Sequence, residues 1–267
     1  VVLLMFSSEV RRSMVLGHLL AALGLTVGLT VKEVEDTVVF VNIPIAIVEL
    51  QAFLNDDLAP NVYNDTAWLS INPYHLQSLS SKVGPVFVPI PGQSGVVVKT
   101  VAHVSMADGS QPGYMIIDMD FDASIIGGVQ AAGCKTTQVG VNCYHCASSK
   151  VNESHVTVVT EDGSSLDFEY ALDASVPADA GLVTLAAETH WKYEQNGIKG
   201  TWTVGNQSGR THGPASAIKL SGLRSDIVSS RHGWPGEAAP TLCKAGTCFS
   251  MPLLQFVDGD GGVYAAA

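Results

Sequence analysis

The sequence predicts a mainly β domain preceded by one membrane-spanning helix. From residue 60 onward, short β-branched runs alternate with clusters of Gly, Pro, Asn and Asp, and dipeptides such as Asp108-Gly109 supply tight turns between them. The helix is predicted by the 18-residue apolar run 14–31, in which His18 is the only ionisable residue. These boundaries divide the chain into an N-terminal segment, 1–36, a connecting segment, 37–83, and a β domain, 84–267.

The apolar run 14–31 is long enough to cross a hydrocarbon core, which needs about 20 residues. Gly17, Gly24 and Gly28 are poor choices in a water-exposed helix, but small residues let membrane helices pack closely. Arg11 and Arg12 precede the run. They are expected to keep the N-terminus on the cytoplasmic or stromal side and to send the β domain to the lumenal or extracellular side. The alternatives are a signal-peptide apolar region and a buried core helix.

A second apolar stretch, Val38–Leu54, contains polar residues that are costly at mid-bilayer depth, among them Asn42 and Glu49. It is therefore predicted to be a strand or a short amphipathic helix. It packs either against the membrane surface or a partner subunit, or within the core as an ordinary element.

The β domain contains nine predicted strands. Their spacing favours a sandwich or barrel over a parallel α/β sheet. The strands are Val86–Ile90, Val96–Val104, Tyr114–Phe121, His155–Val159, Leu166–Leu172, Leu182–Ala187, Gly200–Val204, Phe249–Leu254 and Gly262–Ala265. One helix signal interrupts them at Ser225–Arg231.

The five cysteines predict disulfides and therefore an oxidising compartment. The expected pairs are Cys134 with Cys143 or Cys146, and Cys243 with Cys248, which leaves one thiol over. Zinc is the alternative, but no second closely spaced pair completes a usual ligand set beside Cys143-x-x-Cys146. Three glycosylation sequons agree with the same side of a membrane, and they begin at Asn64, Asn152 and Asn206.

The charge balance excludes nucleic-acid partners. With 25 acidic against 14 basic residues, the formal charge is −11, and the cationic surface that neutralises phosphates is missing. The sequence also has no Gly-x-Ser-x-Gly elbow, no P-loop and no Gly-x-Gly-x-x-Gly. Acyl transfer, nucleotide hydrolysis and dinucleotide binding therefore have no motif to support them, and no cofactor is expected.

The stretch Val86–Ile126 resembles the start of a pepsin-type aspartic protease, particularly the alveolate forms. Later segments follow in the family's order. Cys134–Cys143 is similar to the small cysteine loop after the first active-site strand, and Ser216–Ser229 to the Gly-Leu-Gly segment with its helix. Cys248–Gly259 is similar to the hairpin that closes the N-terminal lobe. The resemblance implies a single pepsin-like lobe over residues 84–267.

The chain departs from this family at the residues that carry its chemistry. The reaction needs two carboxylates, one from each lobe, that share a proton. At the position of Asp-Thr-Gly-Ser the chain has Asp120-Phe121-Asp122-Ala123-Ser124, and no second Asp-Thr-Gly or Asp-Ser-Gly occurs. Asp120 is thus a vestigial candidate, and the resemblance predicts a lobe without catalysis.

Three carboxylates, Asp118, Asp120 and Asp122, alternate with Met119, Phe121 and Ala123. On an extended strand the carboxylates share one face while the other three residues face the core. This row fits either a site for Ca²⁺ or another hard cation, or a solvated strand face. We favour the solvated face, because three adjacent anions repel one another and are costly to bury. No metal is predicted.

These observations together predict a non-catalytic, membrane-anchored accessory subunit of a larger membrane complex. Its expected partners are other membrane-protein subunits and the lipid bilayer, and a photosynthetic complex of a plastid thylakoid fits the alveolate resemblance. One alternative is an aspartic endopeptidase, present as a fragment, that uses Asp120. A second alternative is a secreted, glycosylated β module for adhesion.

Overall fold

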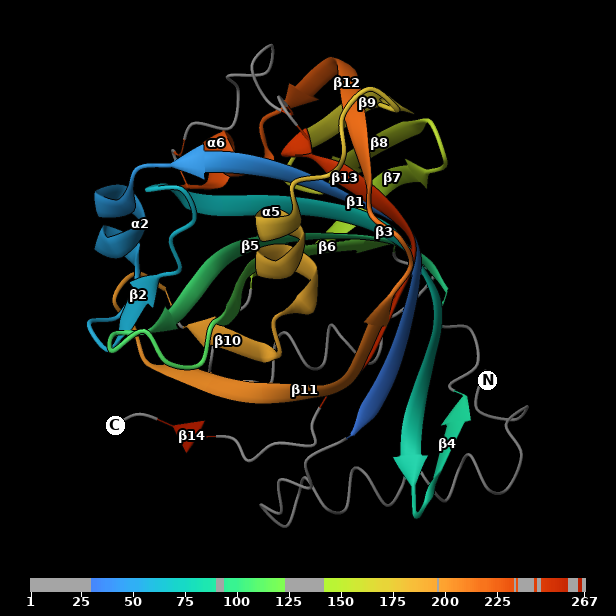
Figure 1. The fold of residues 1–267 in the computed structure, drawn as a ribbon. Coiled ribbons are helices and arrows are strands. Elements are labelled where there is room, and N and C mark those ends of the chain that lie inside the picture. Colours follow the sequence, from blue (N-terminus) through green and yellow to red (C-terminus); the bar gives the residue numbers. More distant parts are fainter. Residues whose placement is uncertain are drawn as a thin grey trace.

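The computed structural model describes residues 30–89, 94–122, 142–195, 197–232, 234, 243, 246–258 and 264–265. Fourteen strands within these residues form one sheet, accompanied by short helices (Figure 1). The prediction of a mainly β fold is therefore confirmed.

Seven strands of the sheet close into a ring. Each is paired with the next, and the last, β13, is paired again with the first, β1. The pairing of β6 with β10 is parallel and the other pairings in the ring are antiparallel. In ring order the strands are β1 (Val31–Ile45), β3 (Ala67–Val83), β5 (Gly95–Met106), β6 (Gly113–Asp122), β10 (Trp191–Gln195), β11 (Trp202–His212) and β13 (Phe249–Asp258).

A second path of strands also runs from β6 back to β13. It consists of β7 (Asn142–Val151), β8 (His155–Thr160), β9 (Ser165–Leu172) and β12 (Ser216–Ser225). The short strands β2 (Leu58–Pro60), β4 (Val86–Pro89) and β14 (Tyr264–Ala265) pair with β5, β3 and β11. Strands β1, β3 and β5 thus form a wall that the two paths share.

The shared wall separates two buried cores. Successive side chains of a strand point to opposite faces. On β1, Val39 and Val41 therefore join the core on the side of β8 and β9, whereas Val38 and Phe40 join the core inside the ring. Burial on both faces explains why these strands are almost continuously apolar in sequence.

Two short helical segments cover the interior of the ring. They are α5 (Ala180–Val183) and the π-helical turn η1 (Thr184–Glu188), and Figure 1 shows α5 in front of β5 and β6. Asp179 caps α5, because its carboxylate accepts hydrogen bonds from the backbone N–H groups of Gly181 and Leu182. The strand predicted over Leu182–Ala187 is wrong: this cap starts a helical turn, and its apolar side chains pack into the ring's core.

Two further helices lie outside the ring, α2 (Ile47–Phe53) and α6 (Ile227–His232). The helix signal at Ser225–Arg231 is confirmed by α6. The predicted strand-or-helix stretch Val38–Leu54 is both, since β1 continues to Ile45 and α2 follows. Its expected position against a membrane or a partner is corrected, because most of its residues on β1 are buried in the two cores.

The expected membrane span is wrong at its C-terminal end, which is the part of it that the structure describes. Val31, the last residue of the predicted span, begins β1 and pairs with Asp258 and Ser81. Within the described residues, no helix has the length and apolar character needed to cross a bilayer. The rest of the predicted span, with Gly17, Gly24 and Gly28, lies outside these residues. The single-pass localisation, with a β domain on the lumenal or extracellular side, is therefore not supported.

Residues 37–83, expected to form a connecting segment, contribute β3 and most of β1 to the middle of the sheet. β3 pairs with β5 on one side and with β1 on the other. The structure thus joins residues on both sides of position 84 in one sheet.

Candidate functional site

The interior of the ring contains a buried cavity of about 30 Å³, which we call the inner cavity. That volume is about the share of one water molecule in the liquid. Its polar lining residues come from five strands of the ring, and they are Glu35, Asn72, Tyr74, Lys99, Tyr114 and Arg210.

Lys99 is the central cation of this cavity. Its Nζ lies 2.8 Å from Oε1 of Glu35 and 3.2 Å from Oε1 of Glu33. The hydroxyl of Tyr74 donates a 2.9 Å hydrogen bond to the same oxygen of Glu33. The ammonium group also lies 4.6 Å from the centroid of the Tyr74 ring and 5.4 Å from that of Phe256. Two carboxylates and two aromatic faces therefore surround one amine.

Burial and charge act in opposite directions on these groups. Burial raises the pKa of Glu35 to about 7, although Lys99 lowers it. Burial lowers the pKa of Lys99, but Glu33 and Glu35 raise it more, so it lies above its ordinary value. The site thus holds an ammonium ion beside a carboxylate that can take up a proton near neutral pH.

Arg210, on β11, is the second cation that lines the inner cavity. Its guanidinium carbon lies 5.5 Å from the ring centroid of Tyr114 and 5.4 Å from that of Phe256. Its Nε donates to the carbonyl of Ala187, and Nη2 donates to the carbonyl of Ala186 at 3.4 Å. One side chain therefore contacts both the cavity and the last carbonyl groups of η1.

A chain of buried polar groups continues from the cavity along the shared wall. Asn72 lines the cavity, and its Oδ1 has no hydrogen-bond partner among the described residues. Farther along, Ser70 Oγ lies 2.7 Å from Nε2 of His103 and donates to Oδ1 of Asn42. Burial lowers the pKa of His103 to about 3, and Arg210 adds to this effect. His103 is therefore neutral, and the two cations of the site are Lys99 and Arg210.

A second lysine, partly buried, lies on β10, outside the lining of the inner cavity. Lys192 Nζ lies 2.6 Å from Oδ2 of Asp258 and 3.4 Å from Oε1 of Glu194. Burial lowers its pKa, but these two carboxylates raise it more. Lys192 thus has surroundings similar to those of Lys99 without the cavity, which makes it a natural control.

The carboxylate row of β6 lies outside the ring, against α6. Asp118 and Asp120 are fully buried, so the solvated strand face predicted for them is wrong. Arg231 donates two hydrogen bonds to Asp120, and His232 Nε2 lies 2.6 Å from Asp118 Oδ2. The side chain of Asp122 lies outside the described part. Arg231 of α6 therefore supplies the positive charge that compensates these carboxylates, and His232 supplies a hydrogen-bonding partner.

Asp120 does not form an acid pair of the protease kind. Its carboxylate is bound by the guanidinium of Arg231, which also binds Asp162. Burial raises the pKa of Asp120 to about 6, while Arg231 lowers it. Among the described residues, no three His, Cys, Asp or Glu side chains are placed to hold a metal ion together.

The structure describes the side chains of three of the five cysteines. Cys243 and Cys248 form a disulfide, which is one of the pairs expected from the sequence. Cys146 is buried in β7, and Cys143 belongs to the same strand, but its side chain lies outside the description. Cys134 also lies outside the described residues.

The residues of the inner cavity were not predicted as a site, although the sequence carries two signals for them. Lys99 is the only charged side chain in the apolar run Val96–Val104, where a lysine needs a buried partner. Glu33 and Glu35 alternate in an extended segment, which puts both on one face. Both residues fall within the segment 1–36, for which the sequence predicts a membrane-spanning helix and no site.

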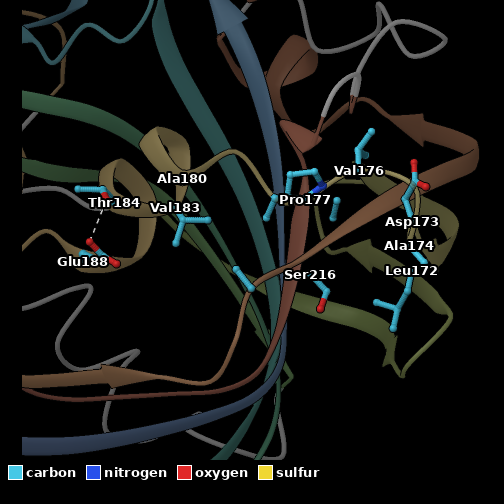
Figure 2. Close-up of a pocket in the computed structure, with 13 residues that line it drawn as sticks. Leu172, Asp173, Ala174, Val176, Pro177, Ala180, Val183, Thr184, Glu188 and Ser216 are labelled. Carbon is cyan, nitrogen blue, oxygen red and sulfur yellow. Dashed lines mark hydrogen bonds between the residues drawn. The ribbon is translucent and has the colours of Figure 1, made fainter.

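A larger, open pocket of about 520 Å³ lies on the other side of α5 and η1, and we call it the outer pocket (Figure 2). Val183, Thr184 and Glu188 line it from the helical side, and the segment Leu172–Ala178 lines it from the opposite side. Ala186 of the same π-helical turn lines the inner cavity. One turn of chain therefore separates the two spaces.

The fold is that of the acetoacetate decarboxylase-like enzymes. Acetoacetate decarboxylase from Legionella pneumophila has a TM-score of 0.56 at 12% identity, covering 89% of this chain and 87% of that one. An acetoacetate decarboxylase-like enzyme from Sphingomonas wittichii has a TM-score of 0.51 at 14% identity, covering 90% and 94%. The enduracididine biosynthesis enzyme MppR in complex with pyruvate has a TM-score of 0.51 at 10% identity, covering 89% and 90%. No protein-family model and no curated protein sequence matches the chain.

These likenesses correct the predicted family and function. The resemblance to a pepsin-like lobe is wrong, because the chain shares its fold with decarboxylase-like structures along about nine tenths of its length. The prediction of a non-catalytic membrane subunit is corrected on the same ground, since these proteins are described as enzymes. The two alternatives, an endopeptidase that uses Asp120 and an adhesion module, are withdrawn with it.

Proposed function

We propose that this protein is an enzyme that binds a short oxo acid in the inner cavity and forms an imine with it at Lys99. The observation that carries the proposal is the position of Lys99: a buried amine at a cavity, 2.8 Å from Glu35. The names of proteins with the same fold support the substrate class, since one is an acetoacetate decarboxylase and another is described in complex with pyruvate. Lysine amines form imines with carbonyl substrates.

Glu35 is placed to move the protons that this chemistry requires. The ammonium group of Lys99 must first lose a proton, and the adjacent Glu35, with its pKa raised to about 7, accepts it. The neutral amine then forms a bond to the carbonyl carbon, while the carbonyl electron pair moves to oxygen and takes up the proton from Glu35. Glu35 next removes a second N–H proton and returns it to the hydroxyl group.

Water then leaves, and the nitrogen lone pair forms the C=N bond. The net reaction converts an ammonium ion and a carbonyl compound into a protonated imine and one water, with Glu35 again a carboxylate. No oxidant or reductant takes part. Because the positive charge stays on nitrogen, Glu33 and Glu35 stabilise the product as they stabilise the free ammonium ion.

The size of the inner cavity limits the ligand to a short chain. At about 30 Å³ the cavity must widen before even pyruvate enters. Asn72 Oδ1, which has no partner among the described residues, gives a ligand hydroxyl group or a water an acceptor. The aromatic rings of Tyr74, Tyr114 and Phe256 leave little room for a branched substituent.

Borohydride trapping tests the proposal. The purified chain is incubated with pyruvate or acetoacetate, reduced with sodium borohydride, and digested for peptide mass spectrometry. We expect one reduced adduct, on the peptide that contains Lys99. Lys99→Arg keeps the buried charge but lacks the nucleophilic amine, and it should abolish the adduct.

Lys192→Arg is the matched control, because Lys192 also lies between two carboxylates but does not line the inner cavity. It should leave the adduct in place. Melting temperatures of both variants establish that each is folded. An adduct spread over surface lysines, or none with either acid, would contradict the proposal.

A further inference from the structure

The inner cavity and the outer pocket are separated by a single turn of chain. Thr184 and Glu188 at the two ends of η1 line the outer pocket, and Ala186 between them lines the inner cavity (Figure 2). The outer pocket, at about 520 Å³, is large enough for a small molecule, whereas the inner cavity holds only about 30 Å³. A ligand that reaches Lys99 by the shortest route from the outer pocket must therefore pass η1.

The beginning of this helical segment is anchored firmly. The carboxylate of Asp179 accepts hydrogen bonds from two backbone N–H groups of α5 and a 2.8 Å bond from the Tyr63 hydroxyl. Gly181 packs so closely on the Tyr63 ring that a side chain at this position would overlap it. Movement of the segment is consequently restricted at its N-terminal end.

The end of the segment is held by two side chains of β11, Arg210 and His212. Arg210 binds the carbonyl groups of Ala186 and Ala187, which belong to the last turn of η1. It is itself fixed by a 2.7 Å bond from Nη1 to Oε1 of Gln207. On the outer side, the Thr184 hydroxyl donates to Glu188 at 2.8 Å, which joins the two ends of η1 to each other. Oε1 of Glu188 also lies 3.4 Å from Nε2 of His212, so this side has a second and more exposed contact with β11.

The π-helical turn is an unusual feature of the backbone. Such turns are rare and occur frequently at functional sites. Terminal carbonyl groups of a helix need partners outside it. Arg210 supplies such partners for η1 and also lines the inner cavity. The backbone of η1 and any molecule in the cavity therefore contact the same side chain.

We propose that η1 is the gate between the outer pocket and the inner cavity, and that Arg210 is its latch. The C-terminal end of η1 swings away when Arg210 releases Ala186 and Ala187 and the exposed contact between Glu188 and His212 opens, while Asp179 and Tyr63 hold the other end. A carboxylate binds a guanidinium group more strongly than a peptide carbonyl does. A carboxylate ligand in the cavity therefore competes with the carbonyl groups of Ala186 and Ala187 for Arg210. This competition rests on the proposed function, whereas the route from the outer pocket past η1 does not.

The test measures how fast Lys99 reacts with formaldehyde and cyanoborohydride, a small probe that methylates amines without any enzyme activity. The rate at Lys99 is compared with that at the exposed Lys219 of the same molecule by peptide mass spectrometry. Arg210→Gln removes the latch, and loss of its charge-assisted hydrogen bonds should raise the relative rate at Lys99 about tenfold or more. Hydrogen exchange should accelerate at residues 184–188 and stay unchanged at β10.

A second variant tests the route from the opposite direction. Ala180 is exposed at the rim of the outer pocket, so Ala180→Trp fills the pocket without entering the core. It should slow methylation of Lys99 relative to Lys219. Ile198→Trp, at an exposed position outside the pocket, is the matched control and should have no effect.

The outcomes separate the gate from the proposed function. Altered methylation of Lys99 in both variants, without an imine to any oxo acid, supports the gate and refutes the enzyme. An imine at Lys99 together with unchanged methylation in both variants refutes the gate and keeps the enzyme. Accelerated exchange throughout the ring in Arg210→Gln, with no effect of Ala180→Trp, also refutes the gate, because Arg210 is then only a general stabiliser.

Discussion

Arg231 binds Asp120 through two hydrogen bonds, 2.8 Å from Nη2 to Oδ1 and 3.1 Å from Nη1 to Oδ2, and this bidentate ion pair joins α6 to β6. The Asp120 side chain is fully buried and that of Arg231 is 4% exposed. Arg231 also pairs with Asp162, so removal of Asp120 takes away both of these hydrogen bonds without leaving the guanidinium unpaired. The pair therefore holds the C-terminal helix against the sheet.

Asp120→Ala should lower the free energy of unfolding by about 1.5–3 kcal/mol, the range for a hydrogen bond to a charged group, because Arg231 keeps its ion pair with Asp162. Urea denaturation followed by circular dichroism measures the change. Asp56→Ala is the control, because Asp56 pairs with Lys199 but is 90% exposed. Exposed pairs contribute about 0–1 kcal/mol. An equal loss of unfolding free energy in the two variants would show that the buried ion pair stabilises the fold no more than the exposed one.

Glu35→Gln should slow imine formation at Lys99 about 10²-fold, because the amide accepts no proton from the ammonium group. Glu33 stays 3.2 Å from Lys99 Nζ in this variant, so the lysine keeps an anionic partner. The rate is measured by borohydride quenching at timed intervals. Glu49→Gln, on the exposed face of α2, serves as control. A rate unaffected by Glu35→Gln would remove Glu35 from the proton transfers.

Acidification should destabilise the fold through His103. Burial lowers the pKa of His103 from 6.5 to about 3 in the folded chain, so between these values the unfolded chain binds a proton that the folded chain does not. Stability contributed by neutral His103 is then lost as the pH falls from 6.5 to 3, by ~5 kcal/mol in total.

The prediction is checked by comparing the wild type with His103→Gln in denaturant titrations at several pH values. The variant is less stable at pH 7, but its stability should fall less steeply between pH 6.5 and 3. The difference between the two slopes isolates His103 from Glu35 and Asp120, whose raised pKa values act in the opposite direction. Parallel pH curves would show that His103 is protonated in the folded state.

Gly113→Ala should destabilise the ring where β6 and β10 run parallel. A methyl group on Gly113 would overlap the carbonyl group of Trp191, and backbone atoms cannot move aside as a flexible side chain does. Overpacking of this kind costs about 1–3 kcal/mol. Gly205→Ala, on the neighbouring β11, meets no atom within 4 Å and should be neutral or stabilising. The melting temperatures of both variants, measured by thermal unfolding, test this prediction. Equal melting temperatures would contradict it.

Local patterns predicted most of the strands and failed where a distant residue decides the outcome. Val96–Val104 and Tyr114–Phe121 were identified as strands, because alternation and turn residues are local properties. The same local pattern predicts a strand over Leu182–Ala187. The cap at Asp179 and the core inside the ring make it helical, and only the second of these depends on strands far away in the chain.

The sequence does not predict the burial of these charged side chains, because their partners are remote in sequence. Asp118 and Asp120 were expected in water, but Arg231 and His232 lie more than 110 residues later. Lys99 meets Glu35 across 64 residues. No local pattern reports such a pairing. An isolated lysine in an apolar strand still indicates that a partner must exist, and that signal was present at Lys99.

The pairing of β1 with β13 joins residues that are far apart in sequence, since Val31 lies opposite Asp258. A ribosome must therefore synthesise all of the chain between these two residues before the two strands can pair. Until then, β1 exposes an unpaired edge on its β13 side, which is the kind of surface that promotes aggregation during synthesis. Folding dominated by such distant contacts is slow. Production of this protein should accordingly benefit from low temperature and from chaperones that shield nascent strands.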